Sequence, residues 1–274
     1  MNNLYDNNKR TIKNYKENNN SIGSFDPEIS ENLNKNYELF AKNYETAFAD
    51  LATRNLEDIA KRTESELLGI DKLILSFFEK WVILDLTKKR IYSIVDKEIF
   101  KIINNSENKN QTDIINKSNV IKHLKNFDFK NIDSYNSNEL EPLDLFSSTI
   151  ILHYLLTADG TPLSGKWILF RELLDGLFYG DTIPGVLQPL VKKYEYSGQE
   201  FLRKILDNGG KIYKDFKFAG VIYPFERFPI LFIFEEKDEE FTADLRVLFD
   251  SSASHYIKSD IIKTLVVYTV KKLL

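Results

Sequence analysis

The sequence is first informative for what it lacks. It contains no cysteine, one methionine, two tryptophans and three histidines among 274 residues. The absence of cysteine excludes disulfides, thiolate nucleophiles, thiolate zinc sites and a self-ligated iron–sulfur cluster. Neither an HxxxH nor an HExxH pair occurs, so we also expect no histidine-rich metal site.

Long apolar runs and an excess of positive charge are missing as well. No run approaches the roughly 18 apolar residues of a membrane span, and the polar N-terminus lacks the apolar core of a signal peptide. A net charge of −4 and a pI near 5.6 argue against a general nucleic-acid binder. We therefore expect a cytoplasmic protein with no membrane or nucleic-acid partner.

Composition along the chain predicts one α+β domain over residues 25–274. Residues 1–24 are rich in Asn and Lys and predict a disordered or loosely held tail. Residues 104–119 have a similar composition and predict a flexible insertion within the domain.

The first half of the domain predicts helices followed by a small sheet. A helix is expected to begin at Asp26-Pro27-Glu28, with Tyr37, Phe40, Tyr44, Phe48 and Leu51 on one face. Asn55 should cap a second helix over 56–67. Three strands are expected at 73–78, 81–86 and 91–95, the first two forming a hairpin through Glu79-Lys80.

The second half predicts helices and then an antiparallel meander packed by helices. The expected helices are 143–156, 186–193, 199–206 and 261–274, the last capped by Ser259-Asp260. The expected meander strands are 217–223, 229–235 and 245–249. Residues 167–173 favour a short strand or a helix start, and residues 176–185 favour a loop. Helices and strands in separate blocks favour an α+β fold.

The densest motif is His153–Leu173, HYLLTADGTPLSGKWILFREL. His153 lies on an apolar helix and suits either an axial tetrapyrrole ligand or a core histidine bonded to a carbonyl. Arg171 suits either a two-point contact with an anionic ligand or an ion pair with Asp250 or Asp238. Its glycine loop departs from the phosphate-loop spacing, because Trp167 follows Gly165-Lys166.

Two further segments carry clustered polar residues. Glu235–Glu240 is an acidic turn that suits either a cation site or a solvated loop. Residues 250–256, DSSASHY, contain Asp, Ser and His, but residues this close in sequence rarely reach triad geometry. Turn formation and capping explain these hydroxyls better.

These three segments resemble an uncharacterised family, the domain of unknown function numbered 3786, over roughly residues 55–274. The resemblance implies an anaerobic bacterial or archaeal source, and it carries no established activity. Some members carry a cysteine-rich iron–sulfur segment similar to that of corrinoid proteins, which this chain lacks. The resemblance marks as motif positions Trp167, Phe170, Arg171, Glu172, Asp238, Glu239, Glu240, Asp250 and Tyr256.

Three hypotheses follow from the sequence. The first is a non-catalytic accessory or ligand-binding protein of anaerobic metabolism, with a small-molecule ligand or a protein partner. Its ligand would be an anionic cofactor such as a corrinoid or haem, held by Arg171 against Trp167 and Phe170, with His153 or His255 as the polar handle.

The second hypothesis is a carboxylate- or metal-dependent enzyme for an anionic small molecule, using Glu172, Asp238, Glu239 or Asp250. The third is a buried polar network that only fixes the packing of the meander.

Overall fold

The computed structural model describes residues 41–94 and 140–274 of two compact units, 1–43 and 44–274. Nearly all described residues belong to the second unit. The predicted tail at 1–24, the helix start at Asp26, Tyr37 and Phe40, and the insertion at 104–119 lie outside the described residues.

The first described elements are two short helices. Residues 41–51 are helical and bury Phe48 and Leu51, as the spacing predicted. The next helix, α3 (Leu56–Thr63), begins at Asn55, whose side chain accepts hydrogen bonds from the backbone N–H groups of residues 57 and 58. The expected end at residue 67 is wrong, because Glu64 adopts a left-handed φ of 56° and stops the helix.

Sheet A is antiparallel, with strand order β1-β2-β3-β4-β5. The predicted hairpin is confirmed, although its turn is Phe78-Glu79, one residue earlier than expected. Phe78 takes a φ of 54° there, a conformation that tight hairpin turns require. The strands are β1 (Glu66–Leu67), β2 (Lys72–Phe77), β3 (Lys80–Asp85), β4 (Arg90–Ile94) and β5 (Leu140–Pro142).

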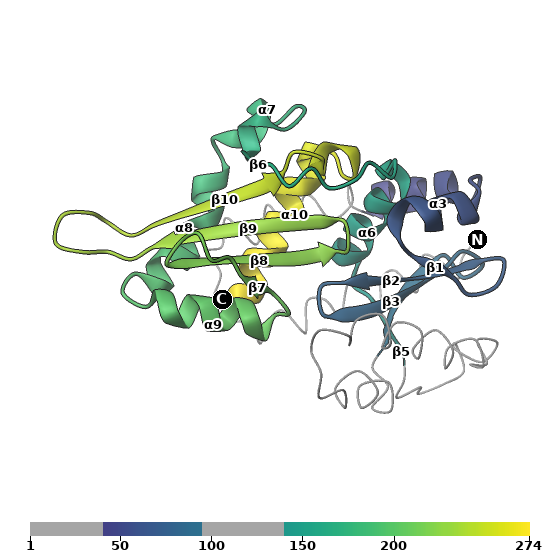
Figure 1. Cartoon of the computed structure of the whole chain (residues 1–274). Coiled ribbons are helices and arrows are strands. Elements are labelled where there is room, and N and C mark those ends of the chain that lie inside the picture. The colour runs from purple at the N-terminus through teal and green to yellow at the C-terminus, as the bar shows by residue number, and fades with distance from the viewer. Residues whose placement is uncertain (1–40, 95–139) are drawn as a thin grey trace. The chain divides into compact units, whose positions relative to one another are not determined.

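Sheet B is the predicted meander, extended by one strand at each edge (Figure 1). Its order is β6-β10-β9-β8-β7, with every neighbouring pair antiparallel. Pro224 lies where β8 loses regular pairing, so its missing N–H costs no ladder bond. The strands are β6 (Trp167–Leu169), β7 (Lys211–Ile212), β8 (Phe218–Phe225), β9 (Phe228–Glu235) and β10 (Asp244–Asp250).

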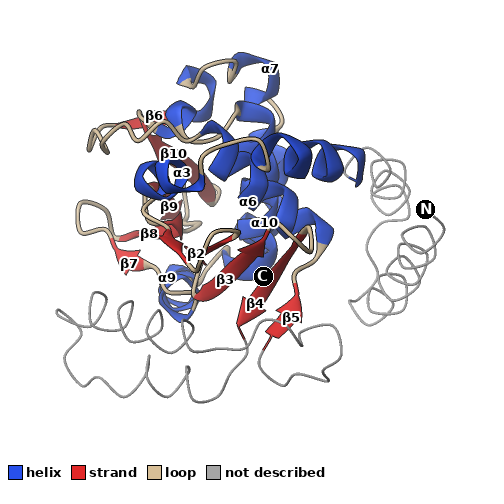
Figure 2. Ribbon diagram, turned by 90° about the vertical axis from the view of Figure 1, so that its right-hand side faces the viewer, coloured by secondary structure: helices blue, strands red, loops and turns tan. Residues whose placement is uncertain are grey.

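Helices complete the predicted α+β fold (Figure 2). They are α6 (Leu145–Thr157), α7 (Leu177–Gly180), α8 (Ile183–Tyr194), α9 (Gly198–Asp207) and α10 (Ser259–Leu273). The loop expected at 176–185 is wrong, since α7 and the first turn of α8 occupy it. Pro184 stands in that first turn, where no N–H partner is needed.

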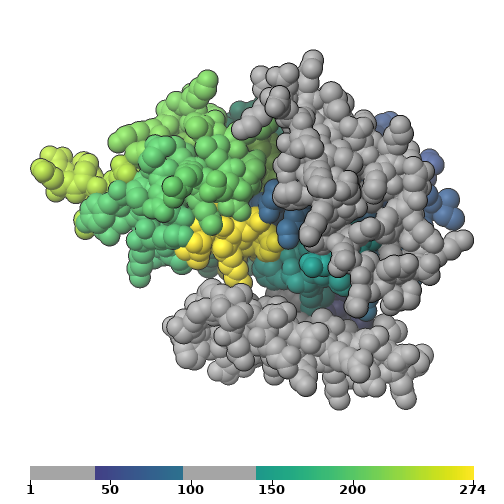
Figure 3. All heavy atoms as spheres, turned by 90° about the horizontal axis from the view of Figure 1, so that it is seen from below, coloured from purple at the N-terminus to yellow at the C-terminus, as the bar shows by residue number. Residues whose placement is uncertain are grey.

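The start of α10 also differs from expectation. Ser259 makes no cap hydrogen bond, and its hydroxyl donates instead to the carbonyl oxygen of Leu174. At the other end, the Tyr194 hydroxyl of α8 donates to the carbonyl of Leu273 at 2.6 Å. Figure 3 shows the C-terminal residues, in yellow, lying against green residues from the second half of the chain.

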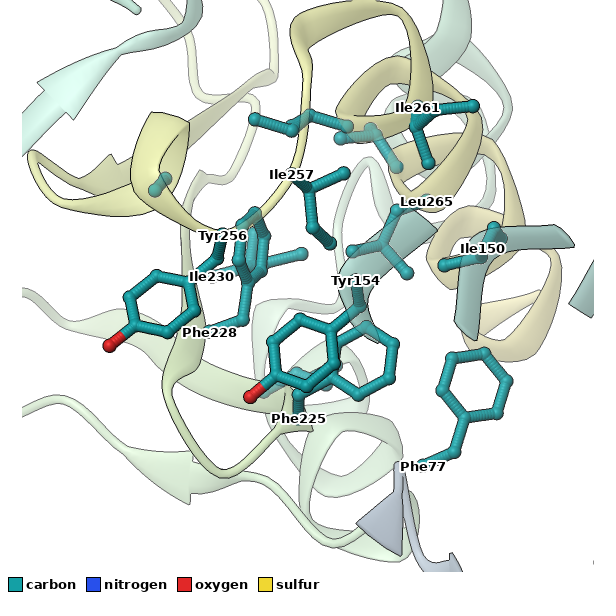
Figure 4. Close-up of a cluster of buried hydrophobic side chains, with 14 of the residues drawn as sticks. Phe77, Ile150, Tyr154, Phe225, Phe228, Ile230, Tyr256, Ile257, Ile261 and Leu265 are labelled. Atoms are coloured by element: carbon teal, nitrogen blue, oxygen red, sulfur yellow. The ribbon is translucent and has the colours of Figure 1, made fainter. Parts of the chain in front are cut away.

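A continuous apolar core lies between the sheets and the helices. Tyr154 of α6 stacks on Phe225 of β8 with ring centroids 3.9 Å apart and planes 1° from parallel (Figure 4). Phe77 of β2 packs on the same Phe225 at 5.3 Å. This contact, with the hydrogen bond from Phe78 N–H to the Pro224 carbonyl, joins the two sheets.

Candidate functional site

Asp250, at the end of β10, is the best-satisfied carboxylate of the motif segments. Its side chain is buried and accepts hydrogen bonds from the N–H groups of Ser164 (3.0 Å), Gly165 (2.7 Å) and Ser252 (2.9 Å). The hydroxyls of Ser164 and Ser252 donate at 2.8 and 2.7 Å. Burial opposes ionisation, but these donors prevail and hold the pKa of Asp250 below its usual value.

The segment from Ala158 to Lys166, between α6 and β6, is tied down through its carbonyl groups. Arg62 of α3 donates to the Ala158 carbonyl, and the Tyr256 hydroxyl donates to that of Thr161. Arg227, in the turn between β8 and β9, donates to the Gly160 carbonyl at 2.9 Å and pairs with Glu64. Three elements far apart in sequence therefore fix this segment.

His255 also helps to hold the segment from Ala158 to Lys166 in place. Its Nδ1 lies 2.8 Å from a carboxylate oxygen of Asp159, and the Asp159 N–H donates to the His255 carbonyl at 3.2 Å. Slight burial opposes ionisation of Asp159, but hydrogen bonds from Thr161 and His255 lower its pKa to about 2. Both side chains are half exposed, so the pair lies at the surface.

The aromatic residues of the motif do not form one wall. Phe170 is in the core, edge-on to Phe249 at 5.8 Å. Trp167 packs on the other face of sheet B, against Tyr213 at 6.1 Å. Glu172 accepts a hydrogen bond from the Leu169 N–H at 2.7 Å and so closes the short helix η2 (Phe170–Glu172).

Arg171 is exposed and forms no ion pair within residues 41–94 and 140–274. The predicted pairs with Asp250 and Asp238 are not formed. Asp250 is satisfied by Ser164, Gly165 and Ser252, and Asp238 accepts from the N–H groups of residues 240 and 241 in its own turn. The acidic turn, with Glu239, also lies beyond the far end of β10, roughly 20 Å from Asp250 by strand length.

Beside Arg171 the chain exposes a group of large apolar side chains. The exposed fractions are 72% for Leu174, 77% for Leu177, 81% for Phe178 and 41% for Leu169. Figure 1 shows α7 beyond β6, the edge strand of sheet B that pairs with β10. We call this the α7 surface; it comprises Leu169, Arg171, Leu174, Asp175, Leu177 and Phe178.

Hydrogen bonds from the 250–256 segment and α10 hold the α7 surface in place. The Leu174 N–H donates to Ser254 Oγ at 3.0 Å, and the Ser259 hydroxyl donates to the Leu174 carbonyl. At Gly176 a Cβ atom would lie 2.0 Å from the carbonyl oxygen of Phe170, so only glycine fits this turn. Asp250, His255 and Tyr256 contact residues 159–165, whereas the acidic turn, which was expected at the same site, lies at the far end of β10.

His153 does not belong to this surface. It lies on α6, where its Nε2 atom is buried and has no hydrogen-bond partner among the described residues. Burial lowers the pKa of His153.

Sequence reasoning missed the apolar half of the α7 surface and the serines that brace it. The signal was present in the run Leu173–Phe178, LLDGLF, whose leucines and phenylalanine have no place in a solvated loop. The Gly and Asp residues of that stretch suggested only a turn. Arg227 was missed because its partners lie 67 and 163 residues away.

One family model covers all three motif segments. The model of a family described as a domain of unknown function (DUF3786) matches residues 119–272, more than half of the chain. The chain belongs to this family. The match confirms the resemblance and includes Asp250, its serine partners and the α7 surface. No curated protein and no solved structure matches the chain.

Two further observations concern the described residues alone. In residues 41–94 and 140–274, no three His, Asp or Glu side chains gather as metal ligands would. Over the same part of the chain, no helix has the length and apolar character that crossing a membrane requires.

Proposed function

We propose that this chain is a non-catalytic accessory protein that acts by binding, and that the α7 surface is its binding site. The observation that carries the proposal is an exposed guanidinium, Arg171, beside three strongly exposed apolar side chains. Contiguous exposed apolar surface is uncommon on monomeric proteins and marks interaction sites. We also propose that it acts in the cytoplasm, and the family resemblance suggests a role in anaerobic metabolism.

The chemistry of the surface defines what it would bind. A guanidinium makes two parallel hydrogen bonds with a carboxylate or phosphate. Leu174, Leu177 and Phe178 offer apolar contact next to it. The occupant would therefore have an apolar body that carries an anionic group.

The bracing of the surface favours binding. Because Ser254 and Ser259 fix both backbone groups of Leu174, and Gly176 fixes the following turn, little conformational entropy is lost on contact. Exposed apolar residues on an unrestrained loop would lack this advantage.

The enzyme hypothesis gains no support from the carboxylates. Asp250 is satisfied by five hydrogen bonds, Glu172 closes η2, and Asp238 lies in a distant turn. General acid–base catalysis by paired carboxylates needs both side chains within reach of one substrate. These three do not converge.

A corrinoid or haem gains no support from three of the residues that suggested it, His153, Trp167 and Phe170. Axial ligation needs a histidine nitrogen open to a macrocycle, and His153 Nε2 is buried in protein. Trp167 and Phe170 face opposite sides of sheet B, so they enclose no common slot. The proposal therefore keeps an anionic, partly apolar occupant without a tetrapyrrole.

The experiment uses two fluorescent probes on dilute protein. 8-Anilinonaphthalene-1-sulfonate is an apolar anion, and Nile red is an uncharged apolar dye. Arg171→Ala should weaken binding of the anion roughly three- to fivefold, the effect of about 0.7–1 kcal/mol for an exposed charge contact. Leu177→Ser with Phe178→Ser should weaken binding of both dyes.

The matched control is Arg203→Ala, which removes another exposed arginine from α9. It should leave both dyes unaffected. Equal affinity of the anionic dye for wild type and Arg171→Ala would show that the α7 surface is not an anion-binding site.

A further inference from the structure

The α7 surface carries two side chains of opposite charge that form no ion pair with each other or with the rest of the described chain. Arg171 and Asp175 are both exposed, stand four residues apart and form no ion pair within residues 41–94 and 140–274. Leu174 lies between them in sequence, and Leu177 and Phe178 follow directly. The surface thus combines a cation, an anion and an apolar centre.

Such a combination is complementary to itself. Across a two-fold axis the same patch meets itself, so residue i of one copy contacts residue j of the other, and j contacts i. Arg171 of each copy would then face Asp175 of the other, with the leucines and Phe178 enclosed between two ion pairs.

Other occupants fit the charges less well. A strongly anionic surface would be repelled by Asp175, and a strongly basic one by Arg171. An uncharged apolar partner would leave both groups desolvated without a counter-ion. Opposite charges in equal number, on a surface braced at Leu174 and Gly176, favour a partner that carries the same pair.

We infer that the α7 surface is the contact between two copies of this chain. This inference rests on the proposed function and names its occupant. The anionic group that Arg171 receives is the Asp175 carboxylate of the second copy, and the apolar body is that copy's Leu174, Leu177 and Phe178.

Sedimentation velocity and light scattering over about 1–100 µM chain test the inference. Wild type should shift with concentration toward twice the 32.0 kDa chain mass. Arg171→Asp and Asp175→Arg, each alone, place like charges in both pairs and should weaken dimerisation at least tenfold.

A mixture of the two single variants restores both pairs, because one chain then carries only acids and the other only arginines at positions 171 and 175. Equimolar mixing should therefore give heterodimers, and the double variant should dimerise with itself. This rescue separates loss of contact from loss of folding. The exposed Arg203→Asp on α9 is the control that should dimerise as wild type does.

Two results would overturn the inference: a chain that stays monomeric at 100 µM, or a dimer unaffected by Arg171→Asp and Asp175→Arg. The dye experiment on the monomeric chain separates the two proposals. A chain that stays monomeric at 100 µM and still binds the anionic dye through Arg171 overturns the second copy alone. A dimer sensitive to the charge reversals whose monomer shows no Arg171-dependent dye binding overturns the anion-binding site alone.

Discussion

Replacing Asp250 by asparagine keeps the shape of the side chain and removes its charge. One carboxylate oxygen accepts four hydrogen bonds, from the N–H and hydroxyl groups of Ser164 and Ser252. The other accepts from the Gly165 N–H at 2.7 Å. The amide oxygen of asparagine is best placed where the first carboxylate oxygen accepts its four hydrogen bonds. The NH₂ group then faces the Gly165 N–H, and these two donors have no acceptor between them.

The magnitude follows from these contacts. An unsatisfied buried donor costs about 1–3 kcal/mol, and the four remaining bonds lose the strengthening that a charged acceptor gives. We expect Asp250→Asn to lower the free energy of unfolding by about 2–4 kcal/mol at pH 7. With an m-value of about 2–3 kcal/mol per M, the urea midpoint should fall by about 1 M.

Acid should reduce the difference between the two proteins. The pKa of Asp250 in the folded protein lies below its unfolded value. Its stabilisation is therefore present above about pH 4 and is lost as the pH falls through the lowered folded value. The amide of the Asp250→Asn variant does not titrate in this range, so the two midpoints should converge below about pH 4.

Urea unfolding followed by circular dichroism measures both effects. Asp238→Asn is the control, because Asp238 is an exposed acceptor in a turn that asparagine forms equally well. Equal urea midpoints for wild type and Asp250→Asn at pH 7 would refute the view that Asp250 anchors the 158–166 segment.

Three other changes test separate parts of the account. Tyr154→Ala removes the ring stacked on Phe225 and should cost about 3–5 kcal/mol, measured by urea unfolding; a loss below about 1 kcal/mol would contradict the described core. Gly176→Ala places a Cβ against the Phe170 carbonyl, so α7 should shift and binding of the anionic dye should weaken; unchanged binding would contradict the bracing. Asp159→Asn removes an acid whose pKa is about 2 in the folded protein. Between about pH 4 and pH 2, the variant should therefore lose less of its free energy of unfolding than wild type does. Identical acid unfolding curves would contradict this role of Asp159.

Local signals in the sequence predicted much of the fold. Asn55 caps α3 because a short polar side chain before an acidic first turn suffices for that role. The hairpin of β2 and β3 and the meander of sheet B follow from short apolar runs separated by turn residues. Each of these depends on neighbours within a few positions.

Hydrogen bonds between polar groups that lie far apart in the sequence could not be predicted in the same way. The sequence offered Asp250 as a partner for Arg171 on charge alone. The structure satisfies Asp250 with N–H and hydroxyl groups of Ser164, 86 residues away, which no pattern of charges indicates. Arg171 therefore has no partner at Asp250 and is exposed. The α7 surface was not predicted, because Gly176 suggested that its residues form a loop.

Native mass spectrometry of the chain, purified anaerobically from its own host, tests most directly whether the α7 surface binds. The wild-type chain should retain an occupant, either a second copy of the chain or a partly apolar anion. The Arg171→Glu variant should lose this occupant, and the Arg203→Glu variant on α9 should keep it. An occupant retained equally by all three proteins, or a bare monomer in every sample, would contradict the account.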